Sequence, residues 1–366
     1  MVRDAVPLEQ CERALVIKLR HHGDVLLSAP VLSLLKKSNP DMDVDALVYD
    51  DTAPMLDGHP ALSELFTVGR KWRGEGAVSR FFLEKELFSE LRERQYDLVV
   101  HLSEHPRGAW LARGLRARYS VAPKVSGRGD FWKNSFTHLF PVAPRRHMVD
   151  VNLDALRRIG VQPAREDKHV VFVPGGEAQA RIAELVREPF VHLHPASRWR
   201  FKCWPVEKNA ELIDRFATAG LLVVITSAPD PVEVEMAERI VEKASAQAIN
   251  LAGQLSIKEL GALSAAAELF VGVDSMPMHL AAAMGTPTVA LFGPSGEAEW
   301  GPWNTSSRVV ATAHSCRPCG LDGCGGGKVS ECLTLLPVDA VYGAAIELLE
   351  EAANPAQVRI SARTIS

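Results

Sequence analysis

Short apolar runs alternate with amphipathic stretches of helical length along most of the chain. In the first half, runs at 14–19, 44–49, 97–102 and 118–122 are typical of buried strands, and the stretches 24–38 and 80–94 have helical periodicity. This alternation predicts a parallel sheet with helices on both faces. A helix near 148–159 closes the series, and the polar, Gly- and Pro-containing stretch 161–168 is typical of a linker.

The same rhythm then starts again. Strand-like runs occur at 169–173, 190–194, 221–226, 248–250, 269–273 and 288–293, with helical stretches at 205–220, 230–245, 256–267, 276–285 and 337–353. We therefore predict an α/β protein with two doubly wound, Rossmann-like domains, residues 1–160 and 169–345, and a terminal helix end with a flexible tail over 346–366. Sheets of this kind bind ligands at the carboxyl ends of their strands, so we expect a ligand cleft between the domains.

Length and composition agree with two domains in an ordinary globular protein. A chain of 366 residues exceeds what one hydrophobic core holds, and 47% hydrophobic with 23% charged residues is typical of a soluble protein. No apolar run approaches the roughly 20 residues that span a bilayer. Acidic residues precede the short apolar run 14–19, which argues against a secretory signal. We expect a cytoplasmic protein with reduced cysteines.

The net charge of −4 is unevenly distributed. Residues 105–158 carry eleven Lys and Arg against three Asp, whereas the chain after residue 160 has more acids than bases. A solvated surface would explain any single arginine, but this density favours an anionic partner. Nucleic acid is a weak candidate because no zinc-finger, RNA-recognition or helix-turn-helix signature accompanies the charge.

The first candidate site is the segment RHHGD, which follows the strand at 14–19. Its Asp24 stands where a helix begins, so it could be a helix N-cap, a role in which Asp is among the preferred residues. It could equally be a catalytic base, which needs a carboxylate at a strand end. Position alone leaves both roles open, and neither known glycine-rich phosphate-loop pattern is present here.

The second candidate is the loop after the strand at 190–194. It carries Ser197, Arg198, Arg200 and Lys202 with interleaved tryptophans. Hydroxyl and cationic side chains on a strand-to-helix loop suit a diphosphate, because charge-assisted hydrogen bonds to phosphate are strong. A basic surface loop anchored by tryptophans is the alternative.

The third candidate lies at the end of the strand at 269–273. Asp274 and Ser275 precede a helix that carries Met276 and His279. The free backbone amides of a helix start bind anions, while Asp274 would accept hydrogen bonds from sugar hydroxyls. A lone histidine such as His279 on an apolar helix face is more often a core residue.

Several motifs in order resemble one family. The segments RHHGD, KNSFTHL (133–139), FKCWP (201–205), VDSMPMHLAAAMGTP (273–287) and FGPS with W-x-P-W (292–303) together resemble the lipopolysaccharide heptosyltransferases, family 9 of the glycosyltransferases. RHHGD, FKCW and SFTHL are most similar to the heptosyltransferase III branch. The resemblance covers about residues 14–350. It implies the GT-B architecture of two facing Rossmann-like domains, ADP-heptose as donor, inversion at the transferred carbon and no required metal.

The resemblance also implies roles for individual residues. Asp24 matches the general base, and Lys202 matches the basic residue that steadies the departing diphosphate. Ser197 stands where the family usually has a phosphate-contacting Thr, and Glu233 matches, through a loosely aligned stretch, the acid that holds the ribose. The expected donor-binding residues are Ser197, Arg198, Glu233, Asp274, Ser275, Met276 and His279. The expected acceptor-binding residues are Arg20, His21, His22, Arg116, Arg118, Lys124 and Lys133.

Four cysteines fall outside the family motifs. Cys316, Cys319, Cys324 and Cys332 lie in a glycine-rich stretch before the last helix, and four thiols within seventeen residues could bind zinc. The spacing is not the paired CxxC…CxxC form, so metal-free thiols are favoured, with a structural role in either case.

The leading hypothesis is an inverting transfer of heptose from ADP-heptose to the phosphorylated, Kdo-containing inner core attached to lipid A. It would add the third heptose to the second, in peripheral contact with the inner face of the inner membrane. A heptosyltransferase of another acceptor position, another inverting sugar-nucleotide transferase and a related epimerase are alternatives. A non-catalytic nucleotide-binding or metal-stabilised protein is less favoured, because Asp24 and Lys202 occur together.

Overall fold

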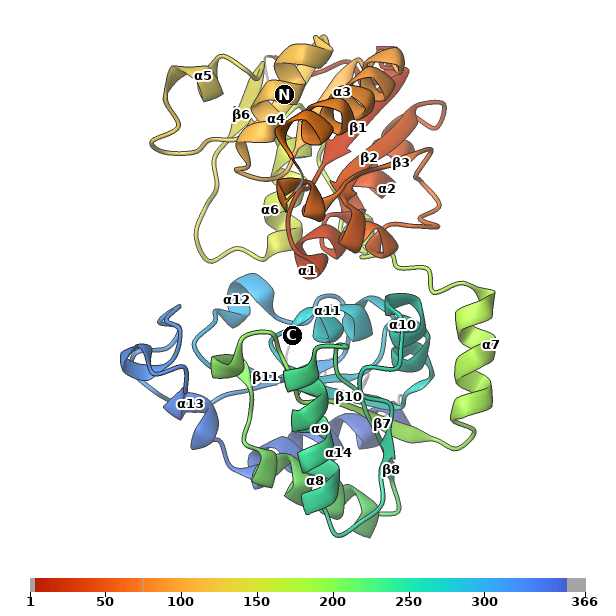
Figure 1. Cartoon of the computed structure of the whole chain (residues 1–366), viewed down its shortest axis with the longest axis vertical. Coiled ribbons are helices and arrows are strands. Elements are labelled where there is room, and N and C mark those ends of the chain that lie inside the picture. The colour runs from red at the N-terminus through yellow and green to blue at the C-terminus, as the bar shows by residue number, and fades with distance from the viewer. Residues whose placement is uncertain (1–3, 75, 354–366) are drawn as a thin grey trace, which may run out of the picture. The chain divides into compact units, whose positions relative to one another are not determined.

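The computed structural model describes residues 4–74 and 76–353, and the chain divides into two compact units, Met1–Val173 and Pro174–Ser366 (Figure 1). Each unit is built on one parallel six-stranded sheet with helices on both faces. The segment 161–168, expected as a linker, lies inside the first unit in this division. Among the described residues, no helix is both long and apolar enough to cross a membrane.

The first sheet has the strand order β3-β2-β1-β4-β5-β6. Its strands are β1 (Arg13–Ile17), β2 (Asp43–Tyr49), β3 (Leu65–Val68), β4 (Leu98–His101), β5 (Tyr119–Pro123) and β6 (His138–Phe140). Strands β2 and β3 lie in order on one side of β1, and β4, β5 and β6 lie in order on its other side. The strand order therefore reverses between β1 and β4, where sheets of this type bind ligands.

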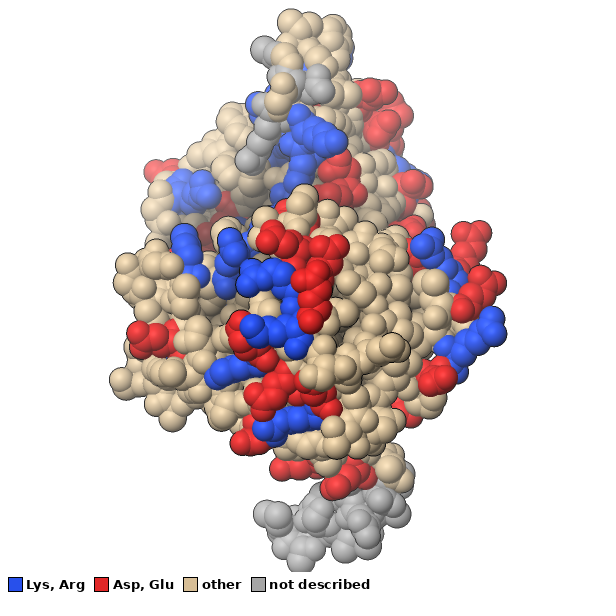
Figure 2. Space-filling model, turned by 60° about the horizontal axis from the view of Figure 1, so that its bottom comes forward, with Lys and Arg blue, Asp and Glu red and all other residues tan. Residues whose placement is uncertain are grey.

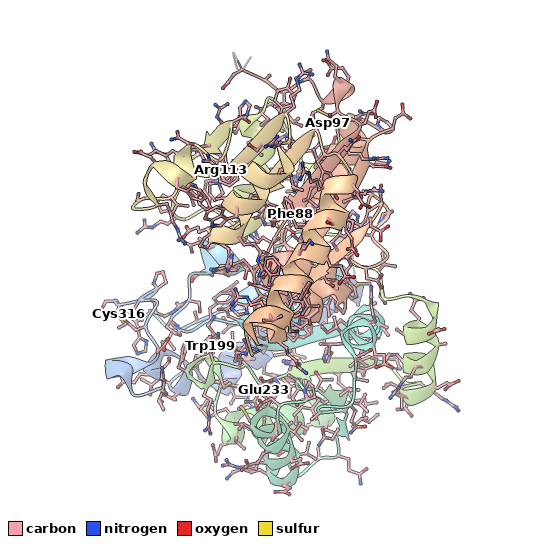
Figure 3. The ribbon with its side chains drawn as sticks, turned by 45° about the horizontal axis from the view of Figure 1, so that its top comes forward. Phe88, Asp97, Arg113, Trp199, Glu233 and Cys316 are labelled. Carbon is pink, nitrogen blue, oxygen red and sulfur yellow. The ribbon has the colours of Figure 1, made fainter. Side chains whose placement is uncertain are left out.

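Helices cover both faces of this sheet. Helices α2 (Ala29–Ser38) and α6 (Met148–Arg158) pack on one face, and α3 (Ala77–Glu93), α4 (Pro106–Leu115) and α5 (Gly129–Lys133) lie over the other. Helices α3 and α4 approach closely at Gly114, where an added Cβ would lie 2.6 Å from the Phe88 ring (Figure 3). A larger residue at position 114 would therefore require the Phe88 ring to move.

The single helix expected over 24–38 is two helices. Helix α1 (His22–Leu26) ends before Ser28, whose hydroxyl donates to the Val25 carbonyl at 2.6 Å, and α2 begins at Ala29. Pro30 lies in the first turn of α2, where its missing amide costs nothing, whereas inside one continuous helix it would break the hydrogen-bond ladder. The break confines Asp24 to a short helix at the end of β1.

The second sheet has the order β12-β11-β10-β7-β8-β9. Its strands are β7 (Phe190–His194), β8 (Leu222–Ile225), β9 (Ile249–Asn250), β10 (Leu269–Val273), β11 (Thr288–Leu291) and β12 (Ser307–Val310). The order reverses between β7 and β10. The strand expected at 169–173 is wrong: that segment is irregular and pairs with none of the strands described in either sheet.

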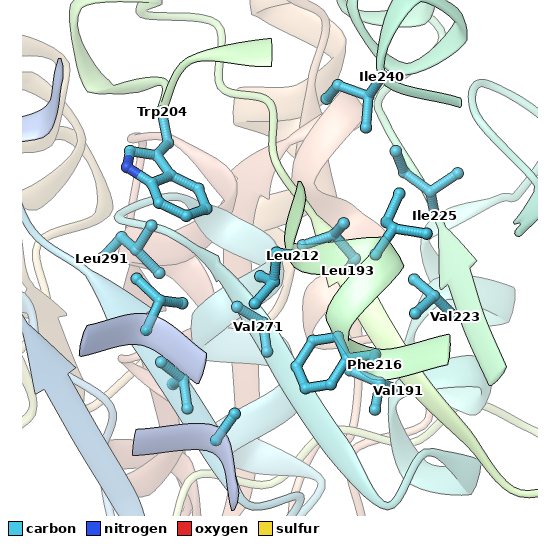
Figure 4. Packing of buried hydrophobic residues seen from close by; sticks show 14 of the residues in the cluster. Val191, Leu193, Trp204, Leu212, Phe216, Val223, Ile225, Ile240, Val271 and Leu291 are labelled. Atoms are coloured by element: carbon cyan, nitrogen blue, oxygen red, sulfur yellow. The ribbon is translucent and has the colours of Figure 1, made fainter. Parts of the chain in front are cut away.

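The core of the second unit lies on the face covered by α8 (Val206–Thr218), α9 (Pro231–Lys243) and α14 (Val338–Ala353). Figure 4 shows Trp204 and Phe216 packed against aliphatic residues of the strands, among them Leu193 and Val271. Helices α7 (Gly176–Leu185), α10 (Ile257–Ala266) and α11 (Met276–Ala283) pack on the other face. Helices α12 (Glu297–Trp300) and α13 (Glu331–Thr334) are short, and the tail expected after α14 lies outside the described residues.

Candidate functional site

A buried lysine connects the neighbouring strands β1 and β4 at the point where the strand order of the first sheet reverses. Lys18, directly after β1, is 3% exposed, and its ammonium donates to the Leu102 carbonyl after β4 and to Asn152 Oδ1 of α6, both at 2.9 Å. Burial lowers the pKa of Lys18 to about 8, although the nearby Asp24 carboxylate opposes that shift. Lys18 thus ties the two central strands to α6 at the carboxyl edge of the sheet.

Asp24 lies beside this lysine and does not cap its helix. The N-cap of α1 is His21, no side-chain capping bond is present, and Asp24 is the third helical residue. Its side chain is largely buried, with Oδ1 3.7 Å from Nε of the exposed Arg20. The N-cap alternative is therefore wrong. Asp24 is thus a largely buried carboxylate at the carboxyl edge of the sheet, near the cations Lys18 and Arg20.

Arg70 holds the turn that carries Asp24, and the sequence patterns did not identify it. Its guanidinium donates to the Arg20 carbonyl at 2.9 Å and to Asp51 Oδ2 at 2.6 Å, and lies 4.1 Å from the centre of the Tyr49 ring. The imidazole Nε2 of His22 is 2.9 Å from the Asp51 carbonyl. The loops after β1 and β2 are thereby fixed to each other.

A cavity of about 720 Å³ opens at the carboxyl ends of β2, β3 and β4. Arginines and aromatic rings dominate its wall, a combination suited to an anionic sugar because arginine binds phosphate in a bidentate manner. The lining residues are Tyr49, Val68, Gly69, Arg70, Trp72, Arg80, Phe81, Glu84, His105, Arg107 and Trp110. The dense basic stretch could have indicated Arg107, but the remaining residues come together only through the fold.

The predicted acceptor-binding cations are divided between two edges of the first sheet. Lys124 directly follows β5 and so lies at the carboxyl edge, and Lys133 ends the neighbouring α5. Arg116 and Arg118 precede β5, at the opposite edge. A strand of five residues spans roughly 15 Å, so these two arginines and Asp24 lie at opposite ends of the sheet.

The reversal point of the second sheet holds an ion pair. Lys202, in the short 3₁₀ helix η5 (Arg200–Lys202) after β7, donates to Asp274 Oδ2 at 2.6 Å. Asp274 directly follows β10 and is 6% exposed. The structure therefore joins the second and third sequence motifs, which are 72 residues apart.

Next to Asp274, helix α11 begins without a side-chain cap. Ser275 is its N-cap residue, but the hydroxyl donates backward to the Val273 carbonyl at 3.3 Å. Pro277 has no amide hydrogen and the Met278 amide donates to the Ser275 carbonyl at 3.2 Å, so this start leaves the Met276 amide to face an anion. His279, one turn further on, is buried, with its ring 6.3 Å from that of Trp300.

A second cavity, of about 510 Å³, lies between the loop after β7, the first turns of α9 and the glycine-rich segment 327–330. Ser197 and Glu233 line it, and so do Arg200, Arg239 and Lys328. Lys202, Asp274, Ser275, Met276 and His279 are not part of this lining. The predicted donor residues therefore form two groups, one around this cavity and one at the β7–β10 reversal point.

Glu233 is the buried acid of the second cavity (Figure 3). Burial raises its pKa, and this shift is partly opposed by a hydrogen bond from the Ala228 amide at 3.3 Å and by the charge of Arg198, whose side chain is exposed.

On the face drawn in Figure 2, acidic and basic side chains alternate within one band. The acidic excess of this half of the chain therefore forms no field of one sign on that face.

The four clustered cysteines, whose spacing allows a zinc site, differ in their exposure. The described part of the chain contains no group of three or more His, Cys, Asp or Glu placed to hold a metal ion. Cys332 is buried, whereas Cys316, Cys319 and Cys324 are exposed. Burial raises the pKa of Cys332, and it raises that of Cys203, in the wall of the second cavity, to about 11.

Two parallel six-stranded sheets, each with a reversal of strand order and charged residues at the reversal point, are the two Rossmann-like domains of the GT-B fold class. A glycosyltransferase of family 9 from Veillonella parvula superposes with a TM-score of 0.81 at 23% identity, covering 95% of this chain and 99% of that one. The E. coli ADP-heptose LPS heptosyltransferase II gives a TM-score of 0.74 at 20% identity over 93% and 99%. These likenesses establish the fold.

Sequence comparison identifies the family of the chain. The family description "Glycosyltransferase family 9 (heptosyltransferase)" matches residues 85–329. Two E. coli proteins named lipopolysaccharide heptosyltransferase 3 are similar: one is 36% identical over 79% of this chain and 85% of its own length, and the K12 protein is 33% identical over 92% and 98%. The chain belongs to glycosyltransferase family 9, the heptosyltransferases, and is therefore a glycosyltransferase.

Proposed function

We propose that this enzyme transfers heptose from ADP-heptose to the inner core of lipopolysaccharide, adding the third heptose to the second. The observation that carries the choice of position is the 36% and 33% identity to two proteins named heptosyltransferase 3, against 23–27% for relatives named heptosyltransferase 1, heptosyltransferase 2 or core heptosyltransferase OpsX. The donor is supported by the solved E. coli heptosyltransferase WaaC with ADP-2-deoxy-2-fluoro heptose, which has the same fold.

In the proposed reaction an acceptor hydroxyl attacks the anomeric carbon of the heptose. The new carbon–oxygen bond forms on the face opposite the bond to ADP, which breaks, so the configuration inverts in one step. Asp24 takes the hydroxyl proton, and ADP leaves with the electron pair of the broken bond. One carboxylate base is sufficient for a single displacement, and its place at the carboxyl edge of the first sheet supports this role.

The second unit holds the donor in this proposal. Lys202 and the uncapped start of α11 would stabilise the negative charge that develops on the diphosphate. Asp274 would turn to the heptose hydroxyls and hold Lys202 in position between turnovers. Ser197 and Arg198 would contact phosphate, and Glu233 would accept hydrogen bonds from the ribose hydroxyls. A fixed cation at the leaving group supplies the charge that a metal ion provides in other transferases.

The first unit holds the acceptor. Arg20, His21, His22, Lys124 and Lys133 would meet the phosphate and carboxylate groups of the inner core, with the arginine-lined cavity as its extension. Arg116 and Arg118 are left out, because they lie at the opposite edge of the sheet. Since the acceptor is a lipid-linked saccharide, we place the enzyme in peripheral contact with the inner face of the cytoplasmic membrane.

Transfer from labelled ADP-heptose to inner-core acceptors carrying none, one or two heptoses tests this function. Incorporation only into the acceptor with two heptoses is expected, and addition of EDTA should leave the rate unchanged. Transfer to a shorter acceptor instead would identify an enzyme of another position in the same series. Absence of transfer to every acceptor, with ADP still bound, would overturn the proposal.

A further inference from the structure

Helix α3 carries exposed apolar residues over its first turns, on the side away from the core. Leu87 and Leu91, on one side, are buried in the core of the first unit. Val78 and Phe82 are about 180° away around the helix from Leu87 and Leu91, respectively, because each residue advances 100°. Both are more than 60% exposed, as is Phe81 next to them. A helix with a second apolar stripe that meets solvent has more apolar surface than its own core uses.

Two further exposed rings extend this stripe. Phe81 of α3 and Trp110 of α4 line the same cavity, and the Trp110 ring lies 4.6 Å from that of Phe131 in α5. The result is one surface from three helices, which we call the aromatic face: Val78, Phe81, Phe82, Trp110 and Phe131, each between 40% and 71% exposed. Contiguous exposed apolar surface of this kind marks an interaction site.

Arginines lie beside part of the aromatic face. The Arg113 guanidinium lies 5.2 Å from the centre of the Phe131 ring, and Arg128, on the chain just before Phe131, lies 5.9 Å from the centre of the buried Trp132 ring. Arg80 and Arg107 stand at the same cavity, where both pair with Glu84. Aromatic side chains rimmed by arginines match the boundary of an anionic bilayer, where rings enter between headgroups and guanidinium groups contact phosphate.

We propose that the aromatic face docks the enzyme on an anionic lipid bilayer. The inference rests on the proposed function, because an acceptor attached to lipid A is presented at a bilayer, and the face adjoins the cavity proposed for its sugars. Residues at the rim of that cavity would then meet the saccharide where it leaves the lipid surface. A helix stripe and two rings, without a membrane-spanning helix among the described residues, would give reversible attachment.

Sedimentation with lipid vesicles tests this inference on the full chain. We expect binding to vesicles of phosphatidylethanolamine with phosphatidylglycerol, weaker binding to phosphatidylcholine alone, and further weakening by salt. The test variant is Val78→Ser/Phe82→Ser/Phe131→Ser, which avoids every residue of the cavity. Loss of three inserted apolar side chains should lower the partition coefficient about ten-fold or more.

The matched control is Val142→Ser/Leu185→Ser/Val309→Ser, three exposed apolar residues elsewhere, which should bind vesicles as the wild type does. Both triple variants should keep the wild-type rate on a soluble, acyl-free inner-core acceptor. Equal vesicle binding by the test variant and the wild type would overturn the inference, as would a face that instead mediates concentration-dependent self-association. Inactivity of the wild type on the soluble acceptor would count against the proposed function alone, since vesicle binding is measured separately.

Discussion

Asp24 is buried beside two cations, and its carboxylate accepts no capping hydrogen bond from the amides at the start of α1. A structural role as a helix cap therefore does not explain this residue. We predict that Asp24→Asn lowers the transfer rate by about 10²–10⁴, the usual effect of losing a general base. ADP affinity, measured by calorimetry, should stay at the wild-type value because the residues proposed to bind the donor belong to the second sheet. Asp41→Asn, an exposed change in the same unit, serves as the control. Near-normal turnover of Asp24→Asn would remove the base from the mechanism.

Removing the charge of Asp274 and removing the charge of Lys202 should change the affinity for ADP in opposite directions. Asp274→Asn removes the carboxylate that engages Lys202 and repels phosphate, so ADP should bind about five-fold more tightly, roughly 1 kcal/mol, while heptose transfer falls. Lys202→Met should weaken ADP binding, and Lys243→Met, an exposed lysine on α9, should not. Calorimetric titration of ADP into the wild type and the three variants measures these affinities. Weaker ADP binding by Asp274→Asn would mean that the carboxylate supports the diphosphate site instead of competing for its cation.

At the scale of elements, Lys18 connects β1, β4 and α6, and its buried charge makes that junction sensitive to pH. The folded pKa of about 8 lies below the ordinary 10.5, so between these values the unfolded chain holds a proton that the folded chain has released. Stability attributable to Lys18 should therefore rise with pH, by about 2 kcal/mol from pH 7.5 to 9.5. Urea unfolding of the wild type and Lys18→Met at both pH values measures it. A constant difference between the two proteins would show that burial does not lower the pKa of Lys18, so that it stays protonated in the folded chain at both pH values.

Elements with strong apolar runs were predictable, whereas those defined by pairing were not. The strand at 269–273 was predicted to the residue because acidic residues bound its apolar run on both sides. The run 169–173 is similarly apolar, yet a strand forms only where a neighbour offers hydrogen bonds, and none of the described strands pairs with it. Strands β3 and β12 were missed: both stand at the edge of a sheet and are mostly not buried, so no clear apolar run marks them.

The candidate site was predictable as motifs and not as geometry. Family resemblance indicated Lys202 and Asp274 separately, but their contact depends on β7 and β10 being neighbours, a fact of topology. Resemblance cannot indicate Arg70, whose position depends on contacts with Arg20 and Asp51. Arg116 and Arg118 seemed equivalent to Lys124 by charge alone, since sequence does not say at which end of a strand a cation stands.

For the whole molecule, the proposed division between an acceptor unit and a donor unit can be tested by charge. We predict that Lys124→Glu/Lys133→Glu raises the acceptor KM several-fold at low salt, with a smaller effect at high salt because ions screen exposed charges. ADP affinity should not change. Arg116→Glu/Arg118→Glu, at the opposite edge of the same sheet, is the matched control and should leave both constants unchanged. The division of labour fails if the first variant shifts ADP affinity and spares the acceptor KM.

The uneven burial of the cysteines gives the enzyme a built-in attachment point for a spectroscopic probe. Burial raises the pKa of Cys11 and Cys203 to about 11, so at neutral pH only about one such thiol in ten thousand is the reactive thiolate. Cys316, Cys319 and Cys324 are exposed, and Cys324 is three residues before the segment 327–330 that lines the second cavity, proposed here to hold part of the donor. With Cys316 and Cys319 replaced by serine, a maleimide fluorophore should label Cys324 selectively and report nucleotide binding as a change in emission.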